Sequence, residues 1–513
     1  MNVKKATQSS ITLMLVIIIS KIVGMLRDIV LANYFGTSNI SDAYLIASSV
    51  PTLLFYFIGH SLSTAYIPMY NKIKADRGSE GALKYSNKIL CLTLCLSTII
   101  IIVLYTIPNL LVKVLAAGFD VETTNIAVKL IRISAPCIYF MTLVHILSGY
   151  LQANKNFIDP ASISLPRNFA IVLSVVISAT YGIEWLGIGL LIAYVLEFIS
   201  LLPFVISKGY RFRFSAKFKD EDVKHTFNIV APILLGMCVG QVNKIVDRSM
   251  ASTIVEGGIS ALTYASVINN AVQEILVTGI ITILFASCSE LVAYGKHEEV
   301  KKKLSITVNT LLFLLIPACL GVIVLAEPIV KLILCRGEFN EISLQMTSSA
   351  LQCYTAGLLF LAIRDTFVKV FYAYEETKIT TITSICAILL NIVLNIVLGK
   401  ILGIQGLALA TSISAACNSF ALFIFLNKKI GDFGMRSAFS VLWKSILSAA
   451  IMIVGVYYSF LWTSEKTTEF IALIASIFIG FIVYMLASLT FRNSPLINFL
   501  RNMKNNPKTQ GDK

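Results

Sequence analysis

The chain has 513 residues, of which 57% are hydrophobic and only 14% are charged, and its mean hydropathy is +0.81. This composition excludes an ordinary soluble globular protein and predicts an integral membrane protein. The formal net charge of +14 would also suit a nucleic-acid-binding protein. The basic residues, however, lie in short segments between apolar stretches, so we expect no nucleic-acid partner.

The first predicted span is unusual because it carries charge. Lys4 and Lys5 precede an apolar run, as in a secretory signal, but no small-x-small cleavage site follows, so we expect a retained span. The run continues through KIVGMLRDIVLANYF, which contains Lys21, Arg27 and Asp28. An ionised side chain at the bilayer centre costs about 2.5–3.5 kcal/mol on insertion scales. We therefore expect these charges to face a water-filled cavity.

The hydropathy pattern predicts an all-α polytopic membrane protein, because a span needs about 20 apolar residues and about fourteen such stretches are present. They begin near Ile11, Ala43, Ile89, Ile126, Ala161, Leu186, Phe227, Ile259, Leu304, Ile342, Thr380, Leu402, Val441 and Phe470. Alternate connections, such as SKGYRFRFSAKFK, are basic, whereas the others, such as YGIEW, carry few Lys or Arg. The positive-inside rule then predicts that both termini are cytoplasmic.

A weak internal repeat recurs at a period of about 220 residues. GYLQANKNF (149–157) resembles FYAYEETKI (371–379), and LGIGLLIA (186–193) resembles LGIQGLALA (402–410). We expect an N-terminal six-helix lobe over 1–220, a C-terminal six-helix lobe over 221–430, and two additional helices over 431–513. Two copies of an even number of spans are parallel repeats, which are typical of transporters with a site between the halves.

Ionisable residues within the predicted spans gather on a few helices. They are Lys21, Arg27, Asp28, Asp42, Lys244, Asp247, Arg248, Glu274, Arg364, Asp365 and Lys369, with Lys129, Arg132 and Arg167 on the fourth and fifth spans. They could be neutralising pairs, and Asp365 can meet Lys369 one helical turn away. On the first span the cations outnumber the single adjacent carboxylate. A surplus of Lys and Arg facing a cavity indicates an anionic substrate group.

Other polar residues indicate less. Asn391 and Asn395 lie one turn apart on an apolar span, where they could bridge helices by hydrogen bonding or supply oxygen ligands to a cation such as Na⁺. The four histidines show no zinc or catalytic spacing, and the ten cysteines form no CxxC pair. No nucleotide-binding or hydrolase motif is present, so we expect a protein that is not an enzyme.

Several segments resemble one known family. SKIVGMLRDIVLANYFGTSNISDAYLIASSVPTLL (20–54) is similar to the opening of the MurJ (MviN) family, which comprises lipid II flippases of the multidrug/oligosaccharidyl-lipid/polysaccharide exporter superfamily. STAYIPMY (63–70), CRGEFN (335–340) and FYAYEETK (371–378) resemble later family signatures. The resemblance implies a bacterial cell-membrane flippase with two parallel lobes. Its cargo would be undecaprenyl-pyrophosphate-linked peptidoglycan precursor, moved to the outer leaflet by alternating access through a cationic cavity.

The resemblance also implies site residues. Substrate-binding positions would be Lys21, Arg27, Asp28, Asp42, Asn168 and Ser260, to which we add Arg248 and Arg364 as cations that could replace missing ones. Family members with a sodium site use positions that match Asp247, Asn391, Asn395 and Thr411, so Na⁺ is a candidate coupling ion. The implied partners are the lipid-linked anionic glycan, membrane lipids and the cell-wall synthesis machinery.

Two positions depart from the family pattern. Many members carry Arg where this chain has Phe55, and Arg where it has Val267. This difference keeps a rival open, namely an exporter of another polyprenyl-linked glycan such as a teichoic-acid, capsule or O-antigen unit. A drug/Na⁺ antiporter would need a net acidic cavity, and a membrane glycosyltransferase or scaffold would need loop carboxylates or a soluble domain. The sequence favours neither.

Overall fold

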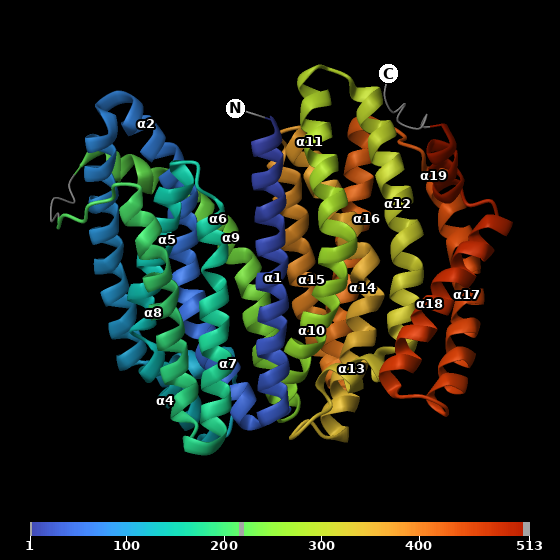
Figure 1. Cartoon of the computed structure of the whole chain (residues 1–513), viewed down its shortest axis with the longest axis horizontal. Helices are drawn as coiled ribbons and strands as arrows, with labels where there is room; N and C mark the ends of the chain where they lie inside the picture. The colour runs from blue at the N-terminus through green and yellow to red at the C-terminus, as the bar shows by residue number, and fades with distance from the viewer. Residues whose placement is uncertain (1–2, 215–219, 506–513) are drawn as a thin grey trace. The chain divides into compact units, whose positions relative to one another are not determined.

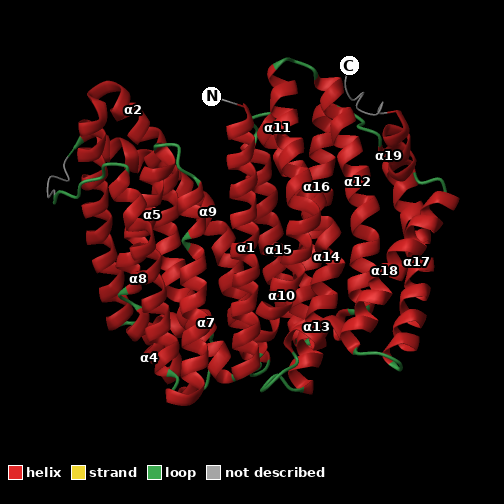
Figure 2. Cartoon of the chain, in the orientation of Figure 1, coloured by secondary structure: helices red, strands yellow, loops and turns green. Residues whose placement is uncertain are grey.

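The computed structural model describes residues 3–214 and 220–505, and within these ranges the secondary structure is helical (Figure 2). The chain divides into two compact units. Unit 1 comprises Met1–Ser260 and Arg336–Asn340, and unit 2 comprises Ala261–Cys335 and Glu341–Lys513. The all-α fold class predicted from hydropathy is therefore confirmed. The lobes predicted from the repeat, with boundaries at 220 and 430, do not coincide with these two units, and the predicted boundaries stay a prediction.

Figure 1 labels the helices in chain order. The first nine are α1 (Val3–Phe35), α2 (Asn39–Thr106), α3 (Pro108–Leu115), α4 (Val121–Ser134), α5 (Cys137–Ala153), α6 (Ile158–Ser162), α7 (Ser164–Tyr181), α8 (Glu184–Ser207) and α9 (Glu221–Ile254). They are followed by α10 (Gly258–Gln273), the π-helix η1 (Glu274–Thr278), α11 (Gly279–Ala293), α12 (His297–Val324), α13 (Ala326–Leu334), α14 (Glu341–Ala373), α15 (Thr377–Leu402), α16 (Ile404–Ile430), α17 (Met435–Ser464), α18 (Glu469–Thr490) and α19 (Ser494–Asn505).

The protein is a multi-pass membrane protein. Among the described residues, ten helices are long and apolar enough to cross a bilayer, or eleven if the bent pair α4 and α5 forms one span. The three remaining predicted spans begin near Ile11, Ala43 and Phe227, on α1, the first part of α2 and α9, where some side chains lie outside the described residues. The predicted number of fourteen therefore stays a prediction.

Local sequence sets the limits of α2. Ser38 and Ser41 form a capping box, in which each side-chain oxygen accepts a hydrogen bond from the backbone amide of the other, and this box starts the helix. Gly78 then interrupts the helix with φ 70° and ψ −175°, a conformation that glycine adopts at little cost. Figure 1 shows that α2 turns back on itself at the end of unit 1 at which α1 begins.

Turns with positive φ recur along the chain with the period of the predicted repeat. Gly36 and Gly257, and likewise Gly182 and Gly403, lie about 220 residues apart and have left-handed backbone angles. Lys155 and Glu375 do so too, each in a turn that ends a helix. When the two repeat copies are aligned on these turns, Lys155 corresponds to Glu375. The alignment predicted from the sequence differs from this one by two residues, because it matched side chains and not the backbone turns.

Small residues let helices approach closely within each unit. In unit 1 a Cβ added at Gly149 of α5 would lie 2.9 Å from the Tyr66 ring of α2. In unit 2 one added at Gly357 of α14 would lie 2.3 Å from Ser412 Oγ of α16. In a bilayer, where lipid is as apolar as leucine, such close backbone packing is a main source of helix association.

Candidate functional site

The charged pair of α1 is built from adjacent residues. Nε and Nη2 of Arg27 donate to the same oxygen of Asp28, at 2.9 and 2.8 Å. The Asp28 side chain is only 10% exposed, whereas that of Arg27 is 34% exposed. Within the described residues Nη1 of Arg27 makes no hydrogen bond, so part of the guanidinium fork remains available to an anion.

Asn168 of α7 lies against α1. Its amide nitrogen would be 3.7 Å from a Cβ at Gly24, which is one helical turn from Arg27 and Asp28 on α1. Asn168 is 4% exposed, and its Oδ1 is buried without a hydrogen-bond partner among the described residues. The neighbouring Arg167 instead pairs with Glu197 of α8 at 3.0 Å. Asn168 therefore keeps an unused buried acceptor next to α1, whereas Arg167 is paired with a carboxylate.

Asp42 and Ser260 are bonded to each other. The Asp42 carboxylate accepts hydrogen bonds from the backbone amides of Ser260 at 2.7 Å and Ile259 at 3.4 Å, at the start of α10. Asp42 is 2% exposed and Ser260 is fully buried. An anionic carboxylate at a helix N-terminus satisfies amides that have no partner within the helix. The predicted substrate contact of these two residues stays a prediction, because in this structure the carboxylate is used by backbone amides.

Unit 2 contains a second Arg–Asp pair on α14. Nε and Nη2 of Arg364 donate to one oxygen of Asp365, at 3.0 and 2.7 Å, and Gln273 of α10 donates to the other at 3.2 Å. The pairing of Asp365 with Lys369, considered from the sequence, is therefore wrong. Both carboxylate oxygens already accept hydrogen bonds, and the Lys369 ammonium lies over the Phe285 ring, 5.3 Å from its centroid.

Two further predicted cations occupy α1 and α9 of unit 1. Lys21 is exposed on α1, and Arg248 is half-buried on α9 beside Asp247. Asp247 accepts a hydrogen bond from Asn243, one turn earlier, at 3.2 Å. The predicted cargo contacts of Lys21 and Arg248 stay predictions.

Three of the four predicted sodium ligands lie together in unit 2. Asn395 donates to Asn391 Oδ1 at 2.9 Å, and Asn391 donates to Thr411 Oγ1 at 3.5 Å and to Ser414 Oγ at 3.1 Å. Carboxamide and hydroxyl oxygens are ligands that a hard cation accepts, so this donor set fits Na⁺. The same bonds also bridge α15 to α16. Asp247 belongs to unit 1, so a site that includes all four residues stays a prediction.

Sequence reasoning missed Ser414, which lies one turn after Thr411 and accepts the shorter of the two hydrogen bonds from Asn391. Residues three apart share a helix face, so the spacing of Thr411 and Ser414 could have predicted that both hydroxyls face Asn391. Among the described residues, no group of three His, Cys, Asp or Glu could hold a metal ion.

Comparison with known proteins identifies the family. The model of the family "Lipid II flippase MurJ" matches residues 31–489. The chain belongs to the MurJ family. The lipid II flippase MurJ of Thermosipho africanus is 30% identical over 494 residues, which cover 96% of this chain and 98% of that protein. The probable lipid II flippase MurJ of Thermotoga maritima is 27% identical over 487 residues, which cover 94% of this chain and 96% of that protein.

Solved structures agree with the MurJ assignment. A lipid II flippase MurJ in an inward closed conformation matches with a TM-score of 0.82 and 29% identity, covering 94% of this chain and 99% of that one. A multidrug-resistance MATE transporter of the MOP superfamily matches with a TM-score of 0.68 at 14% identity, covering 81% of this chain and 96% of that one. The second match shows a shared fold alone.

The two departures from the MurJ pattern differ in their surroundings. Phe55 is 1% exposed, and its ring centroid lies 5.2 Å from that of His145, so this side chain belongs to the packed interior of unit 1. Val267 is half-buried on α10. An Arg could not occupy the buried site of Phe55 without repacking, because a charge there would lose its hydration.

Proposed function

We propose that this chain moves lipid II, the undecaprenyl-pyrophosphate-linked peptidoglycan precursor, from the inner to the outer leaflet of the bacterial cell membrane by alternating access. The observation that carries the proposal is the geometry of Arg27 within an apolar helix. Its Nε and Nη2 donate hydrogen bonds to Asp28, and its Nη1 makes no hydrogen bond to the described residues. A pyrophosphate accepts donors of this planar fork geometry. Membership of the MurJ family supports lipid II as the cargo.

Other residues have supporting roles in the proposal. Asp28 holds the Arg27 guanidinium in place. Asn168 of α7, beside Gly24 of α1, supplies its Oδ1 as an acceptor to a hydroxyl of the sugar headgroup. Lys21, Arg248 and Arg364 are the further cations proposed to contact the cargo, with Asp42 and Ser260 holding the start of α10. The protein acts as a transporter rather than as an enzyme, with both termini on the cytoplasmic side and with the cell-wall synthesis machinery as a partner.

Sodium is the proposed coupling ion. Asn391, Asn395 and Thr411 would hold it in unit 2, with Asp247 as the carboxylate ligand. When bound, the ion would supply the energy of its transmembrane gradient to the conformational cycle. The oxygen donor set of these side chains supports the proposal.

The proposal is tested by complementation of a bacterium depleted of its own lipid II flippase, with direct measurement of lipid II in the outer leaflet. We expect wild type to restore outer-leaflet lipid II and Arg27→Ala to abolish it at equal expression. Arg27→Lys should restore it only in part, because an ammonium lacks the fork. Asp247→Ala tests the coupling ligand. Arg132→Ala, which removes an exposed arginine from α4, is the matched control and should behave as wild type.

One outcome favours the rival cargo. A wild-type protein that is well expressed and inserted but moves no lipid II would contradict the proposal and indicate another polyprenyl-linked glycan. Phe55 and Val267, where many relatives have Arg, would then be the first positions to exchange.

A further inference from the structure

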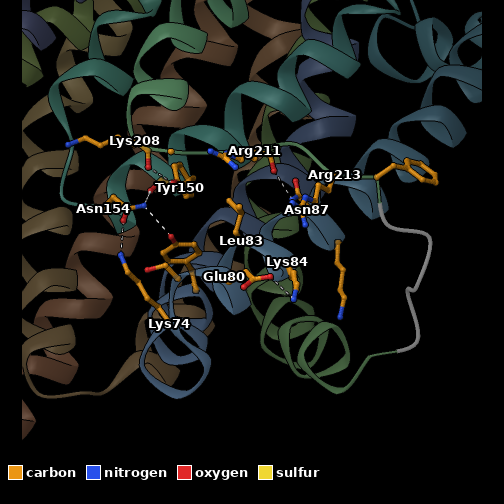
Figure 3. A pocket seen from close by; sticks show the side chains of 15 residues that line it. Lys74, Glu80, Leu83, Lys84, Asn87, Tyr150, Asn154, Lys208, Arg211 and Arg213 are labelled. Atoms are coloured by element: carbon orange, nitrogen blue, oxygen red, sulfur yellow. Dashed lines mark hydrogen bonds and ion pairs between the residues drawn. The ribbon is translucent and has the colours of Figure 1, made fainter.

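A basic cavity of about 760 Å³ lies in unit 1, at the end where Gly78 interrupts α2 (Figure 3). Three segments line it: the turn region of α2, the C-terminal end of α5, and the chain that follows α8. The lining residues that carry charge are Lys74, Glu80, Lys84, Lys88, Lys208, Arg211 and Arg213. None of them is among the residues proposed to bind lipid II.

The basic residues of this cavity exceed the acidic ones. Glu80 is the one carboxylate in the lining, and it pairs with Lys84 at 2.9 Å. Lys88 pairs with Asp220, and this ion pair holds the pKa of Asp220 below its usual range. Lys74 donates to the neutral Asn154 Oδ1 at 2.8 Å.

Lys208 and Arg211, like Lys74, form no ion pair with a carboxylate in the part of the chain that the structure describes. The net positive charge around this one cavity raises the local potential, which favours an anion there.

Buried side chains hold the cavity wall in place. Asn87 is 3% exposed; its Nδ2 donates to the Arg211 carbonyl at 3.0 Å, and its Oδ1 accepts from the Tyr210 hydroxyl at 2.9 Å. The Tyr150 hydroxyl donates to the Lys208 carbonyl at 2.8 Å. The backbone that carries Lys208 and Arg211 is therefore tied to α2 and α5. Such preorganisation lowers the entropy cost of ligand binding, which a row of solvated surface lysines does not do.

The ligand chemistry follows from the donors. Lys and Arg side chains are the groups that proteins use to bind phosphate, by a point charge and a planar fork respectively. The cavity has room for a phosphate ester with a small polar substituent, given pocket volumes of about 300–1,000 Å³ for small-molecule sites. A phosphate group is therefore the anion that fits best.

The adjoining segment indicates that this phosphate belongs to a lipid. Residues 211–214 read RFRF, in a non-helical stretch after the apolar helix α8. Phe212 is 57% exposed and Phe214 is 76% exposed, which would be unfavourable in water. In segments that bind a membrane surface, Phe side chains are buried at the boundary of headgroups and acyl chains, and basic residues next to a span attract anionic lipids.

We propose that unit 1 binds the phosphate of an anionic phospholipid headgroup in this cavity, on the side predicted to be cytoplasmic. Lys74, Lys208 and Arg211 contact the phosphate, while Phe212 and Phe214 insert at the boundary of the lipid headgroups and acyl chains. The bound lipid anchors the Gly78 end of unit 1 to the inner leaflet. This site does not depend on the identity of the transported cargo.

The test uses the purified full-length protein in a neutral detergent, with native mass spectrometry to measure bound phosphatidylglycerol. The pocket variant combines Lys74→Gln, Lys208→Gln and Arg211→Gln. The matched control, Lys302→Gln with Lys303→Gln and Lys378→Gln, removes the same charge from exposed lysines of unit 2. We expect the pocket variant to bind phosphatidylglycerol at least about tenfold more weakly than wild type, and the control to bind as wild type does.

Two further arms identify the source of the phosphate. sn-Glycerol 3-phosphate should compete weakly, and Phe212→Ser with Phe214→Ser should weaken lipid binding. Equal affinity for the soluble phosphate would overturn the lipid assignment, and equal losses in the pocket and control variants would overturn the site. If the pocket variant fails to fold, the single change Lys208→Gln at an exposed side chain is compared with wild type instead, and it should also weaken phosphatidylglycerol binding.

Discussion

Asp42 Oδ1 accepts a hydrogen bond from the backbone amide of Ser260 at 2.7 Å, although the two residues are 218 positions apart in the chain. The second carboxylate oxygen faces the amide of Ile259 at 3.4 Å. Both of these bonds use backbone donors. The Ser260 hydroxyl has two acceptors within reach, the Asp42 carboxylate and the Gly257 carbonyl, the latter at 2.9 Å.

This relationship predicts different effects of two substitutions. Asp42→Asn replaces one acceptor oxygen by a donor and leaves a buried amide unpaired, which should lower the stability by about 1–3 kcal/mol. Ser260→Ala keeps both backbone donors and removes only the side-chain hydrogen bond, so it should have the smaller effect. Thermal unfolding of the purified proteins measures both. If Ser260→Ala were the more destabilising change, the side chain rather than the backbone would hold this contact.

Asn168 should show opposite effects on stability and transport. Its Oδ1 is buried without a partner among the described residues. Asn168→Leu therefore removes an unsatisfied polar group and should leave the melting temperature unchanged or raised, since an apolar group of similar size is tolerated there. Outer-leaflet lipid II in depleted cells should fall with the same variant. A strong loss of stability would instead assign Asn168 a structural role.

Gly337 lies where the chain passes close to α1. Its φ is 58°, and an added Cβ would lie 2.2 Å from the Asn33 carbonyl. Gly295 has a similar φ of 71° with open space around it. Gly295→Ala should cost only the left-handed strain of about 1–2 kcal/mol. Gly337→Ala adds a backbone clash and should cost more, as measured by thermal unfolding. Equal losses would mean that the segment 336–340 moves away without penalty.

Sodium should stabilise the wild-type protein if the proposed ion site exists. A ligand that binds only the folded state raises the melting temperature, by an amount that depends on its concentration relative to Kd. We expect the melting temperature to be higher in NaCl than in choline chloride at equal ionic strength. Asn395→Leu should remove the difference. Identical melting temperatures for wild type in both salts would contradict the ion site. Asn391 and Asn395 would then serve only to hydrogen-bond α15 to α16.

Asp432 provides a prediction for pH dependence outside the spans. Its Oδ1 accepts hydrogen bonds from the amides of Gly434 at 3.0 Å and Met435 at 3.1 Å, and these bonds lower the pKa of Asp432. A lowered pKa in the folded state stabilises the protein above the unfolded pKa, and this contribution is lost as the pH falls through the folded value. Asp432→Ala should therefore lower the melting temperature at neutral pH.

The same variant should approach wild type as the pH falls below the ordinary Asp pKa of about 3.9. A difference in melting temperature that persists at a pH well below the lowered, folded-state pKa of Asp432 would show that the carboxylate charge is not the cause.

The sequence by itself determined the membrane-protein class, the helical fold and the positions of most helices, because about 20 apolar residues in a row can be satisfied in lipid only as a helix. The left-handed turns at Gly36 and Gly257 follow from glycine at both positions.

Only the tertiary structure decided how distant residues are used. Asp42 meets the amide of Ser260, Asp365 prefers Arg364 and Gln273 to Lys369, and Phe55 packs against His145. The basic cavity likewise combines side chains from α2, the end of α5 and the segment after α8. Such contacts depend on which helices become neighbours and how each is rotated, and the hydropathy of a single span contains neither.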